Sequence, residues 1–461
     1  MKMQNAECRN KLCLSLCVMS ALLLSLAGCG SFAPRALPLE GDASSFTFTA
    51  SKHEHAIDLT ATFGKFIIPR ADKFDLLISG IDGLTARISG GDLAGCSLVY
   101  SRANAWELRS IHHPPSANIK NIARIVAVSR SDDPHAARFI SGDEMKTLTA
   151  GQLLALDNLR VLNEEGSSEQ DGKRVTVYTT RWRVPLGDFV EGDVFCAVGF
   201  NGKTACFRDL AGCYLEYNKN TIDLLLPDGK KIEDLAGVLA DPPGFSIGAA
   251  YSDAMHFLEE NQRVMVLELD GLGWNMLQAA GTEWAPYLSS LTPKRAMAAY
   301  PPISPVGLAT LLTGEGPDVH GIHDREVRPP ACEDIFTSAR KLGKNRAYIE
   351  GRSALIGTSL QPVLSLSDAE VYANTRQALA DNADLIFAHF HEIDDLAQQH
   401  GPTAPETLQK IREIDLCVRN LAQGFNGRVI VTADHGLHEI HGGGTHGEFL
   451  ADDLIVPYFL I

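Results

Sequence analysis

Basic residues are scarce relative to acidic ones in this sequence of 461 residues. Lys and Arg number 41 against 57 Asp and Glu, a formal charge of −16, which argues against nucleic acid as a partner bound through a basic surface. No long apolar run occurs after the first thirty residues, which excludes a protein with several membrane spans. The 45% of hydrophobic and 21% of charged residues are typical of a packed globular chain. At about 150 residues per domain, the length predicts two or three domains.

Closely spaced cysteine pairs are absent as well. None of the ten cysteines belongs to a Cys-x-x-Cys motif, so the sequence does not indicate a structural zinc site built from thiolates. Beyond residue 29 the chain keeps six cysteines: Cys96, Cys196, Cys206, Cys213, Cys332 and Cys417. Six cysteines allow many disulfide connectivities, and the pairing stays open here. Free, buried thiols are the alternative.

The first thirty residues have the pattern of an export signal. A basic start over residues 2–11 precedes an apolar run over 12–27, which is too short to span a bilayer comfortably. The run ends in Leu26-Ala27-Gly28-Cys29, which resembles the lipobox of bacterial lipoproteins. The resemblance implies removal of a signal peptide of residues 1–28, a lipid on Cys29, and an extracytoplasmic protein anchored to the bacterial cell membrane through that lipid. An ordinary signal peptide with a chance cysteine is the alternative.

Residues 45–235 form a β-rich segment. Short runs of β-branched and apolar residues are separated by Asp-Gly, Gly-Gly and Asn-Gly pairs, which favour tight hairpins. The runs are Ile57–Ile68, Leu76–Ile78, Ile122–Val128, Val175–Trp182 and Ile222–Leu226. We interpret 45–235 as an accessory domain of unknown role, preceded by a linker over 29–44 and followed by the turn-forming Asp241-Pro242-Pro243-Gly244.

The pattern changes in residues 255–461. Three largely continuous apolar runs, Val264–Leu269, Leu385–Phe390 and Val429–Thr432, predict strands of a parallel sheet covered on both faces. A helical pattern with one apolar face runs through residues 408–421, between the second and third strands. The alternation of strands and helices predicts an α/β layered domain with a mainly parallel central sheet.

An acidic residue follows each of the three predicted strands. Asp270 comes directly after the first, Asp394 soon after the second, and Asp434-His435 after the third. In open α/β sheets ligands bind at the carboxyl ends of strands, so we expect these side chains to meet. Nine of the fifteen histidines lie between His320 and His446. Carboxylates and imidazoles at strand ends suit zinc, or a comparable divalent ion, at a catalytic site.

Five motifs follow one another along residues 260–461. They are Asp270-Gly271-Leu272; Pro301-Pro302-Ile303-Ser304-Pro305 with Thr310-Leu311-Leu312-Thr313-Gly314; Pro317-Asp318-Val319-His320-Gly321-Ile322; Thr432-Ala433-Asp434-His435-Gly436; and Thr445-His446-Gly447. In this order they resemble the alkaline phosphatase superfamily, and within it the type I phosphodiesterase/nucleotide pyrophosphatase branch. The resemblance implies an alkaline-phosphatase-like fold and metal-dependent hydrolysis of a small phosphorylated substrate.

The resemblance also implies a role for each matching residue. Ser304 matches the nucleophile, and with Asp270, Asp434 and His435 it matches the ligands of the metal that activates that nucleophile. Asp394 and His446 match two ligands of a second metal, which would hold the attacking water. The implied cofactor is a pair of zinc ions. A metal site next to Ser304 is consistent with this role, because a serine hydroxyl is a poor nucleophile until a cation lowers its pKa.

Two positions depart from the family pattern. The family places His four residues after the second-metal Asp, whereas this chain has Gln398, a doubtful ligand because a neutral amide oxygen binds zinc more weakly than imidazole. On a helix His400 would point away from Asp394. Nucleotide pyrophosphatases also place Asn three residues after the nucleophile, where this chain has Gly307. Arg325 or Arg328 could compensate, although a solvated surface role also fits each of them.

The sequence therefore predicts a hydrolase that cleaves phosphodiester or nucleotide pyrophosphate bonds through a covalent phosphoserine at Ser304. A phosphomonoesterase, a sulfatase or a phosphoryl-headgroup transferase is an alternative, since the fold does not determine the substrate. An alternative of another class is a non-catalytic surface lipoprotein with a degenerate site, in which the β-rich segment does the binding.

Overall fold

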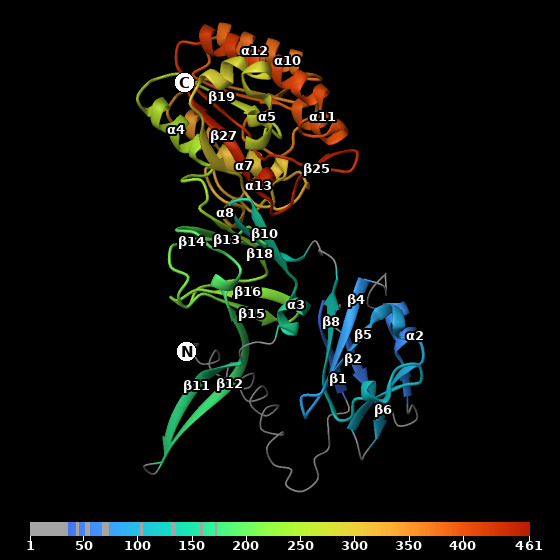
Figure 1. Cartoon of the computed structure of the whole chain (residues 1–461). Helices are drawn as coiled ribbons and strands as arrows, with labels where there is room; N and C mark the ends of the chain where they lie inside the picture. The colour runs from blue at the N-terminus through green and yellow to red at the C-terminus, as the bar shows by residue number, and fades with distance from the viewer. Residues whose placement is uncertain are drawn as a thin grey trace, which may run out of the picture. The chain divides into compact units, whose positions relative to one another are not determined.

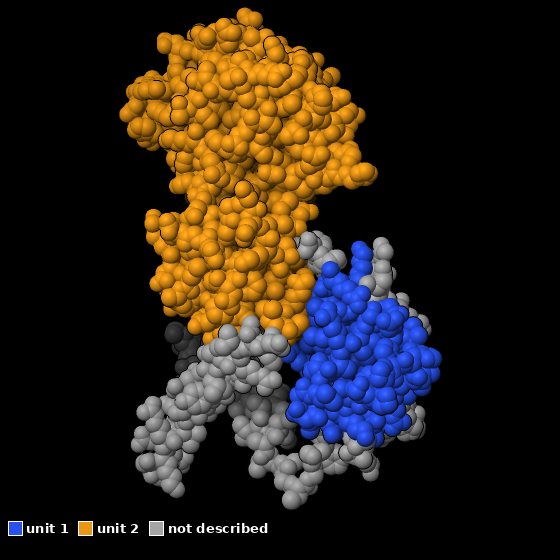
Figure 2. Space-filling model, viewed as in Figure 1, with its two compact units in different colours: residues 1–131 blue, residues 132–461 orange. Residues whose placement is uncertain are grey.

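A computed structural model describes residues 36–42, 46–50, 56–66, 73–101, 105–130, 135–156, 160–170 and 173–461. The predicted signal peptide and Cys29 lie outside these residues. The chain divides into two compact units, Met1–Ser131 and Asp132–Ile461, which are coloured in Figure 2. The division falls inside the segment 45–235 that the sequence suggested as one accessory domain. None of the helices described here is long and apolar enough to cross a membrane.

The first unit contains two small sheets and a helix. One sheet has the order β2-β1-β8-β4-β5, and the other has the order β3-β6-β7. Their bounds are β1 Ala36–Gly41, β2 Phe46–Thr49, β3 Ala56–Asp58, β4 Phe74–Gly80, β5 Thr85–Ser89, β6 Cys96–Ser101, β7 Ala105–Ser110 and β8 Ile122–Ser129, with helix α2 at Leu59–Phe66. The predicted strand runs Leu76–Ile78 and Ile122–Val128 are confirmed as parts of β4 and β8.

Two expectations for this unit are wrong. Strand β1 lies within the predicted linker 29–44, where alternating burial of Leu37 and Leu39 marks one core-facing side. The predicted strand run Ile57–Ile68 is mostly helix α2. The Asp58 carboxylate accepts a hydrogen bond from the Ala61 backbone N–H at 2.8 Å, which caps a helix and ends strand β3.

The second unit begins with two antiparallel-rich sheets. Their orders are β10-β9-β18-β13-β14 and β11-β12-β15-β16-β17. The bounds are β9 Ala137–Ser141, β10 Glu144–Leu148, α3 Ala150–Ala155, β11 Arg160–Gln170, β12 Lys173–Pro185, β13 Phe195–Gly199, β14 Thr204–Phe207, β15 Tyr214–Asn218, β16 Thr221–Leu225, β17 Lys231–Ile232 and β18 Leu235–Ala240. Side chains of both sheets share one apolar core. The strand predicted at Val175–Trp182 is confirmed within β12, and that at Ile222–Leu226 is confirmed in β16.

A seven-stranded sheet organises the rest of this unit. Its order is β20-β27-β24-β19-β23-β21-β22, with β19 at Val264–Leu269, β20 at Lys294–Met297, β21 at Arg346–Glu350, β22 at Val363–Leu364, β23 at Leu385–Phe390, β24 at Arg428–Thr432 and β27 at Ile455–Leu460. The pairs of β19 with β23 and β24 are parallel, as are β21–β22 and β21–β23, while β20–β27 and β24–β27 are antiparallel. Every residue of β19 and β23 is buried. The predicted, mainly parallel central sheet of an α/β domain is therefore confirmed, whereas its alkaline-phosphatase-like layering stays a prediction.

Helices surround this sheet (Figure 1). Helices α4, α5, α9 and α10 contact its strands directly, and α12 turns an apolar side with Ile411, Val418 and Leu421 inward, in agreement with the predicted pattern. The bounds are α4 Ala249–Glu259, α5 Trp274–Trp284, α6 Pro286–Ser290, α7 Ser304–Thr313, α8 Pro317–His320, α9 Ile335–Lys341, α10 Asp368–Ala380, α11 Glu392–His400, α12 Pro405–Gly424 and α13 Ala451–Leu454. A small hairpin, β25 (His438–Ile440) with β26 (Gly443–Thr445), follows strand β24.

The face of β13 and β18 that points away from their shared core packs against this α/β part. Cys196 and Val198 of β13 belong to a cluster with Tyr300 and Phe449, all of them buried. Gly237 of β18 makes this approach possible, because a Cβ at this position would lie 2.3 Å from a ring carbon of Phe449. Phe449 lies three residues after His446, so the packing anchors the segment that carries this predicted ligand.

Replacing Gly237 by Ala should therefore destabilise the protein. The added methyl group would overlap the Phe449 ring and the Arg138 carbonyl, and such overpacking costs about 1–3 kcal/mol. Urea unfolding measures this effect. Gly244→Ala is the control, because a Cβ there meets no atom within 4 Å. Equal stability of the two variants would contradict this account of the interface.

Candidate active site

The acidic residues predicted at strand ends lie together at one edge of the sheet. Strand β19 is flanked by β23 and β24, and all three run parallel. Their carboxyl ends therefore place Asp270, Asp394 and Asp434 side by side, Asp394 in the first turn of α11. The three residues are buried, at most 8% exposed as whole residues, and His435 is fully buried.

The first group of ligand atoms comprises Asp270, Asp434 and His435, which all lie within 4.8 Å of one another. His435 Nε2 is 3.4 Å from Asp270 Oδ1 and 3.3 Å from Asp434 Oδ2. Ser304 Oγ lies 3.2 Å from the same nitrogen, at the first residue of α7. The hydroxyl group thus borders a compact set of two carboxylates and one imidazole.

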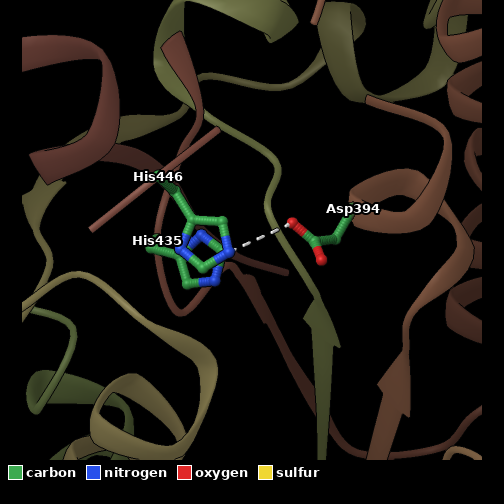
Figure 3. A group of neighbouring side chains, drawn as sticks. All are labelled: Asp394, His435 and His446. Carbon is green, nitrogen blue, oxygen red and sulfur yellow. Dashed lines mark ion pairs between the residues drawn. The ribbon is translucent and has the colours of Figure 1, made fainter. Parts of the chain in front are cut away.

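The second group comprises Asp394, His435 and His446 (Figure 3). His446 Nε2 is 3.8 Å from Asp394 Oδ1, and the rings of His435 and His446 stack with centroids 3.9 Å apart. His435 therefore contributes to both groups, whereas the sequence assigned it to the first only. The glycines of β26 allow this hairpin to approach α11 closely, because a Cβ on Gly443 would lie 2.3 Å from the Gln398 carbonyl oxygen.

Both histidines present a lone pair to the site. Nδ1 of His435 donates to the Gly436 carbonyl at 3.1 Å, and Nδ1 of His446 donates to the Pro302 carbonyl at 2.9 Å. These bonds leave Nε2 of each ring as the acceptor, which is how metal-binding histidines are oriented. Burial lowers the pKa of His435 to about 3, so the ring is neutral at pH 7.

The three carboxylates are only partly compensated by hydrogen bonds. Asp270 Oδ1, Asp394 Oδ1 and Asp434 Oδ2 are buried and have no hydrogen-bond partner among the described residues. Burial raises the pKa of all three, that of Asp394 to about 6. Unpaired buried charge is costly, and a divalent cation would offset it. The oxygen and nitrogen donors of both groups fit zinc or a similar ion.

One family model matches this part of the chain. Residues 264–363 and 356–456 match the model described as Type I phosphodiesterase / nucleotide pyrophosphatase. The match supports a phosphate-ester hydrolase. It contains Ser304 and all the residues of the two groups, and metal dependence is general in this family. The search of curated proteins found no match.

Gln398, at the position where the resembled family pattern has histidine, lies at the second group. Its Nε2 is 2.5 Å from Asp394 Oδ2, to which it donates, and 3.4 Å from His446 Nε2. One helical turn of α11 separates Gln398 from Asp394, which places the two side chains on the same face. His400 is the exposed last residue of α11. Only the amide oxygen of Gln398 can bind a metal, which requires the amide to turn over.

Gly307 is the second position that differs from the family pattern, and close packing explains why it is glycine. A Cβ at this position would lie 2.6 Å from both the Cβ and the backbone oxygen of Asp434. Helix α7 therefore rests directly on a predicted ligand, and this packing leaves no room for the family's asparagine.

The two arginines proposed as compensation have different surroundings. Arg325 lines a cavity of about 280 Å³ that also borders Ser304, Asp270 and Asp394, and its Nη2 is 3.3 Å from His446 Nε2. Arg328 instead pairs with Asp324 at 2.8 Å and with Glu326 at 3.3 Å. Of these two arginines, Arg325 is therefore the one placed to contact a ligand in the cavity.

Behind Asp270 lies a buried polar network that the sequence reasoning missed. His389 Nε2 donates to Asp270 Oδ2 at 3.1 Å, and its Nδ1 donates to Glu350, which also accepts from the Tyr348 hydroxyl. Burial by itself would lower the pKa of His389, but the nearby carboxylates Glu268 and Glu350 raise it well above its usual value. The positive ring therefore orients and partly neutralises Asp270. Glu268 and His389 are register partners on β19 and β23. Each is a polar residue within an apolar run, and this feature of the sequence could have indicated a buried polar network.

Asp394→Asn should have opposite effects on the metal-free and the zinc-loaded protein. In the metal-free protein the pKa of Asp394 is about 6, against about 4 when unfolded. Ionisation of this carboxylate therefore lowers the free energy of unfolding progressively as the pH rises from about 4 to about 6. Above about pH 6 the whole loss is present. At pH 7.5 and without metal, the variant should unfold at a higher temperature than wild type. When zinc is added, the unfolding temperature of the variant should rise less than that of wild type. At pH 4 the advantage without metal should vanish.

Asp395→Asn is the matched control for this experiment. Asp395 follows Asp394 directly, but its carboxylate is 45% exposed and pairs with Arg352. Calorimetry at both pH values, with chelator or with zinc, makes the comparison. The assignment of Asp394 as a ligand fails if both variants keep the full stabilisation by zinc.

Proposed function

We propose that this protein hydrolyses phosphodiester or nucleotide pyrophosphate bonds with two divalent metal ions, most simply zinc, and a covalent phosphoserine at Ser304. The observation that carries the proposal is the position of the Ser304 hydroxyl, 3.2 Å from His435 Nε2 and beside the buried carboxylates Asp270 and Asp434. A hydroxyl group placed at a cation site is the arrangement that nucleophilic catalysis by serine needs.

Ser304 would attack the phosphorus atom and displace the leaving oxygen. The bond from Ser304 Oγ to phosphorus forms as the bond to the leaving group breaks, and water then cleaves the phosphoserine to restore the hydroxyl group. Ions bound by the two groups would lower the pKa of the hydroxyl and stabilise charge on the phosphoryl oxygens. Ser304 also starts the ten-residue helix α7, whose positive N-terminal end favours a phosphate group.

The cavity supports a substrate larger than a phosphate monoester. Beyond Ser304 and the carboxylates it is lined by Arg325, Arg352 and Leu355, with a volume of about 280 Å³. The guanidinium group of Arg325 would bind a phosphoryl oxygen, a role that Gly307 cannot fill. Arg352 and Leu355 would contact the second group of a diester. A phosphomonoesterase, a sulfatase and a headgroup transferase remain the alternatives on this scaffold.

The two metal sites should differ in affinity. The first group offers two carboxylates and an imidazole in addition to Ser304. The second offers Asp394 and His446 with the amide of Gln398, because His435 is already used by the first. We therefore propose that zinc fills the first site readily and the second only at a higher free concentration.

The lipobox-like sequence completes the proposal. Lipidation at Cys29 would anchor the hydrolase to the bacterial cell membrane and expose it outside the cytoplasm. A non-catalytic surface lipoprotein is the alternative, and it requires that the purified chain hydrolyse nothing.

Ser304→Ala should reduce hydrolysis about a thousand-fold or more, because the covalent route is removed. Ser304→Thr should retain part of the activity, since the family uses either hydroxyl group. The assay compares an aryl phosphodiester, an aryl phosphomonoester and an aryl sulfate with zinc present, and the diester should react fastest. Ser290→Ala, on the exposed end of α6, is the control. Near-normal turnover by Ser304→Ala would rule out the nucleophile assignment.

Gln398→His should strengthen the second site, because it places an imidazole on the same helical face as Asp394. Zinc content after dialysis against low free zinc should rise from about one toward about two per chain. A product burst caused by slow breakdown of the phosphoserine should become smaller. His400→Ala is the control and should change neither quantity. If His400→Ala empties the site and Gln398→His does not fill it, the ligand is His400.

A further inference from the structure

Two cysteines face each other across an antiparallel hairpin. Cys196 of β13 and Cys206 of β14 are register partners, and their sulfur atoms are 3.1 Å apart. Cys196 is buried in the cluster that packs against Tyr300 and Phe449, whereas Cys206 is exposed. By contrast, the thiols of Cys96 and Cys213 donate to the backbone carbonyls of Asp92 and Asp209.

We propose that Cys196 and Cys206 form a disulfide when the chain meets a thiol-oxidising environment. Directly opposed residues of an antiparallel pair have Cα and Cβ separations that a disulfide accepts. The strands are already held in this register by the neighbouring pairs Phe195–Phe207 and Ala197–Ala205. The bond therefore needs only a small movement of the two sulfur atoms. This inference is independent of the proposed function.

The two thiols differ in a way that favours stepwise oxidation. The hydrogen bond between the two thiols lowers the pKa of Cys206 to about 7, and the same contact, with burial, raises the pKa of Cys196. The exposed Cys206 thiolate would attack an external disulfide, form a mixed disulfide and release one thiolate. Cys196 would then lose its proton, attack Cys206 Sγ and release the second thiol. The external disulfide gains the two electrons.

The bond would strengthen one edge of its sheet. Strand β14 has four residues and lies at the end of the sheet order, where its one neighbour among the described strands is β13. The turn of this hairpin contacts the segment that leads to Ser304, because Phe200 packs against the Tyr300 ring with centroids 6.0 Å apart. Gly202 lies against Pro317, the first residue of α8. Linking β13 to β14 would thus hold the surface on which Tyr300 and α8 pack.

The test uses the full chain equilibrated with oxidised or reduced glutathione. The samples are denatured in an alkylating reagent and their peptides are analysed by mass spectrometry. Oxidised samples should contain one linked peptide pair, Cys196 with Cys206, and reduced samples should contain both alkylated. Thermal unfolding of the oxidised form should occur several degrees higher than that of the reduced form.

Two cysteine variants distinguish the effect of this disulfide from the effect of oxidation at other cysteines. Cys206→Ser changes an exposed side chain, so it should fold and lose the difference between oxidised and reduced forms. Cys332→Ser, which leaves the pair intact, should keep the difference. The proposal is overturned if both thiols remain alkylated in oxidised glutathione. It is also overturned if Cys206 carries only glutathione, or if either cysteine is linked to another one.

Discussion

Three carboxylates buried at the ends of adjacent parallel strands are the constraint on which the rest of the site depends. Asp270, Asp394 and Asp434 each keep an oxygen without a hydrogen-bond partner in the described structure. Strand order brings them together, since β19 lies between β23 and β24. Such charge is tolerated only with compensation. The fold supplies part of it through the positive His389 ring behind Asp270. The proposed cations would offset the remainder.

Close packing holds the other parts of the site against these carboxylates. Gly307 lets helix α7, with Ser304 at its start, rest on Asp434, and the glycines of β26 bring His446 toward Asp394. Phe449, buried against β18, holds the segment that follows His446. Ser304 and His446 are therefore positioned by contacts that admit little change of volume. Gly307 therefore leaves no empty space at the position where the resembled family pattern has asparagine.

Much of the α/β domain could be predicted because its signals are local. Strands β19 and β23 have the predicted bounds, since largely continuous apolar runs identify buried parallel strands. The use of His435 by both ligand groups could not be predicted, because it depends on ring stacking with His446 across the fold. The Glu350–His389 contact is equally non-local. In the β-rich part, the Asp58 carboxylate caps a helix within a run that has the composition of a strand.

The central claim is that these side chains form two adjacent cation sites next to Ser304. Diffraction at the zinc absorption edge, from crystals of the full chain grown with zinc, tests it most directly. We expect a strong anomalous peak among Asp270, Ser304, Asp434 and His435, and a weaker one beside Asp394, Gln398 and His446. Zinc bound elsewhere, with neither of these positions occupied, would contradict the account.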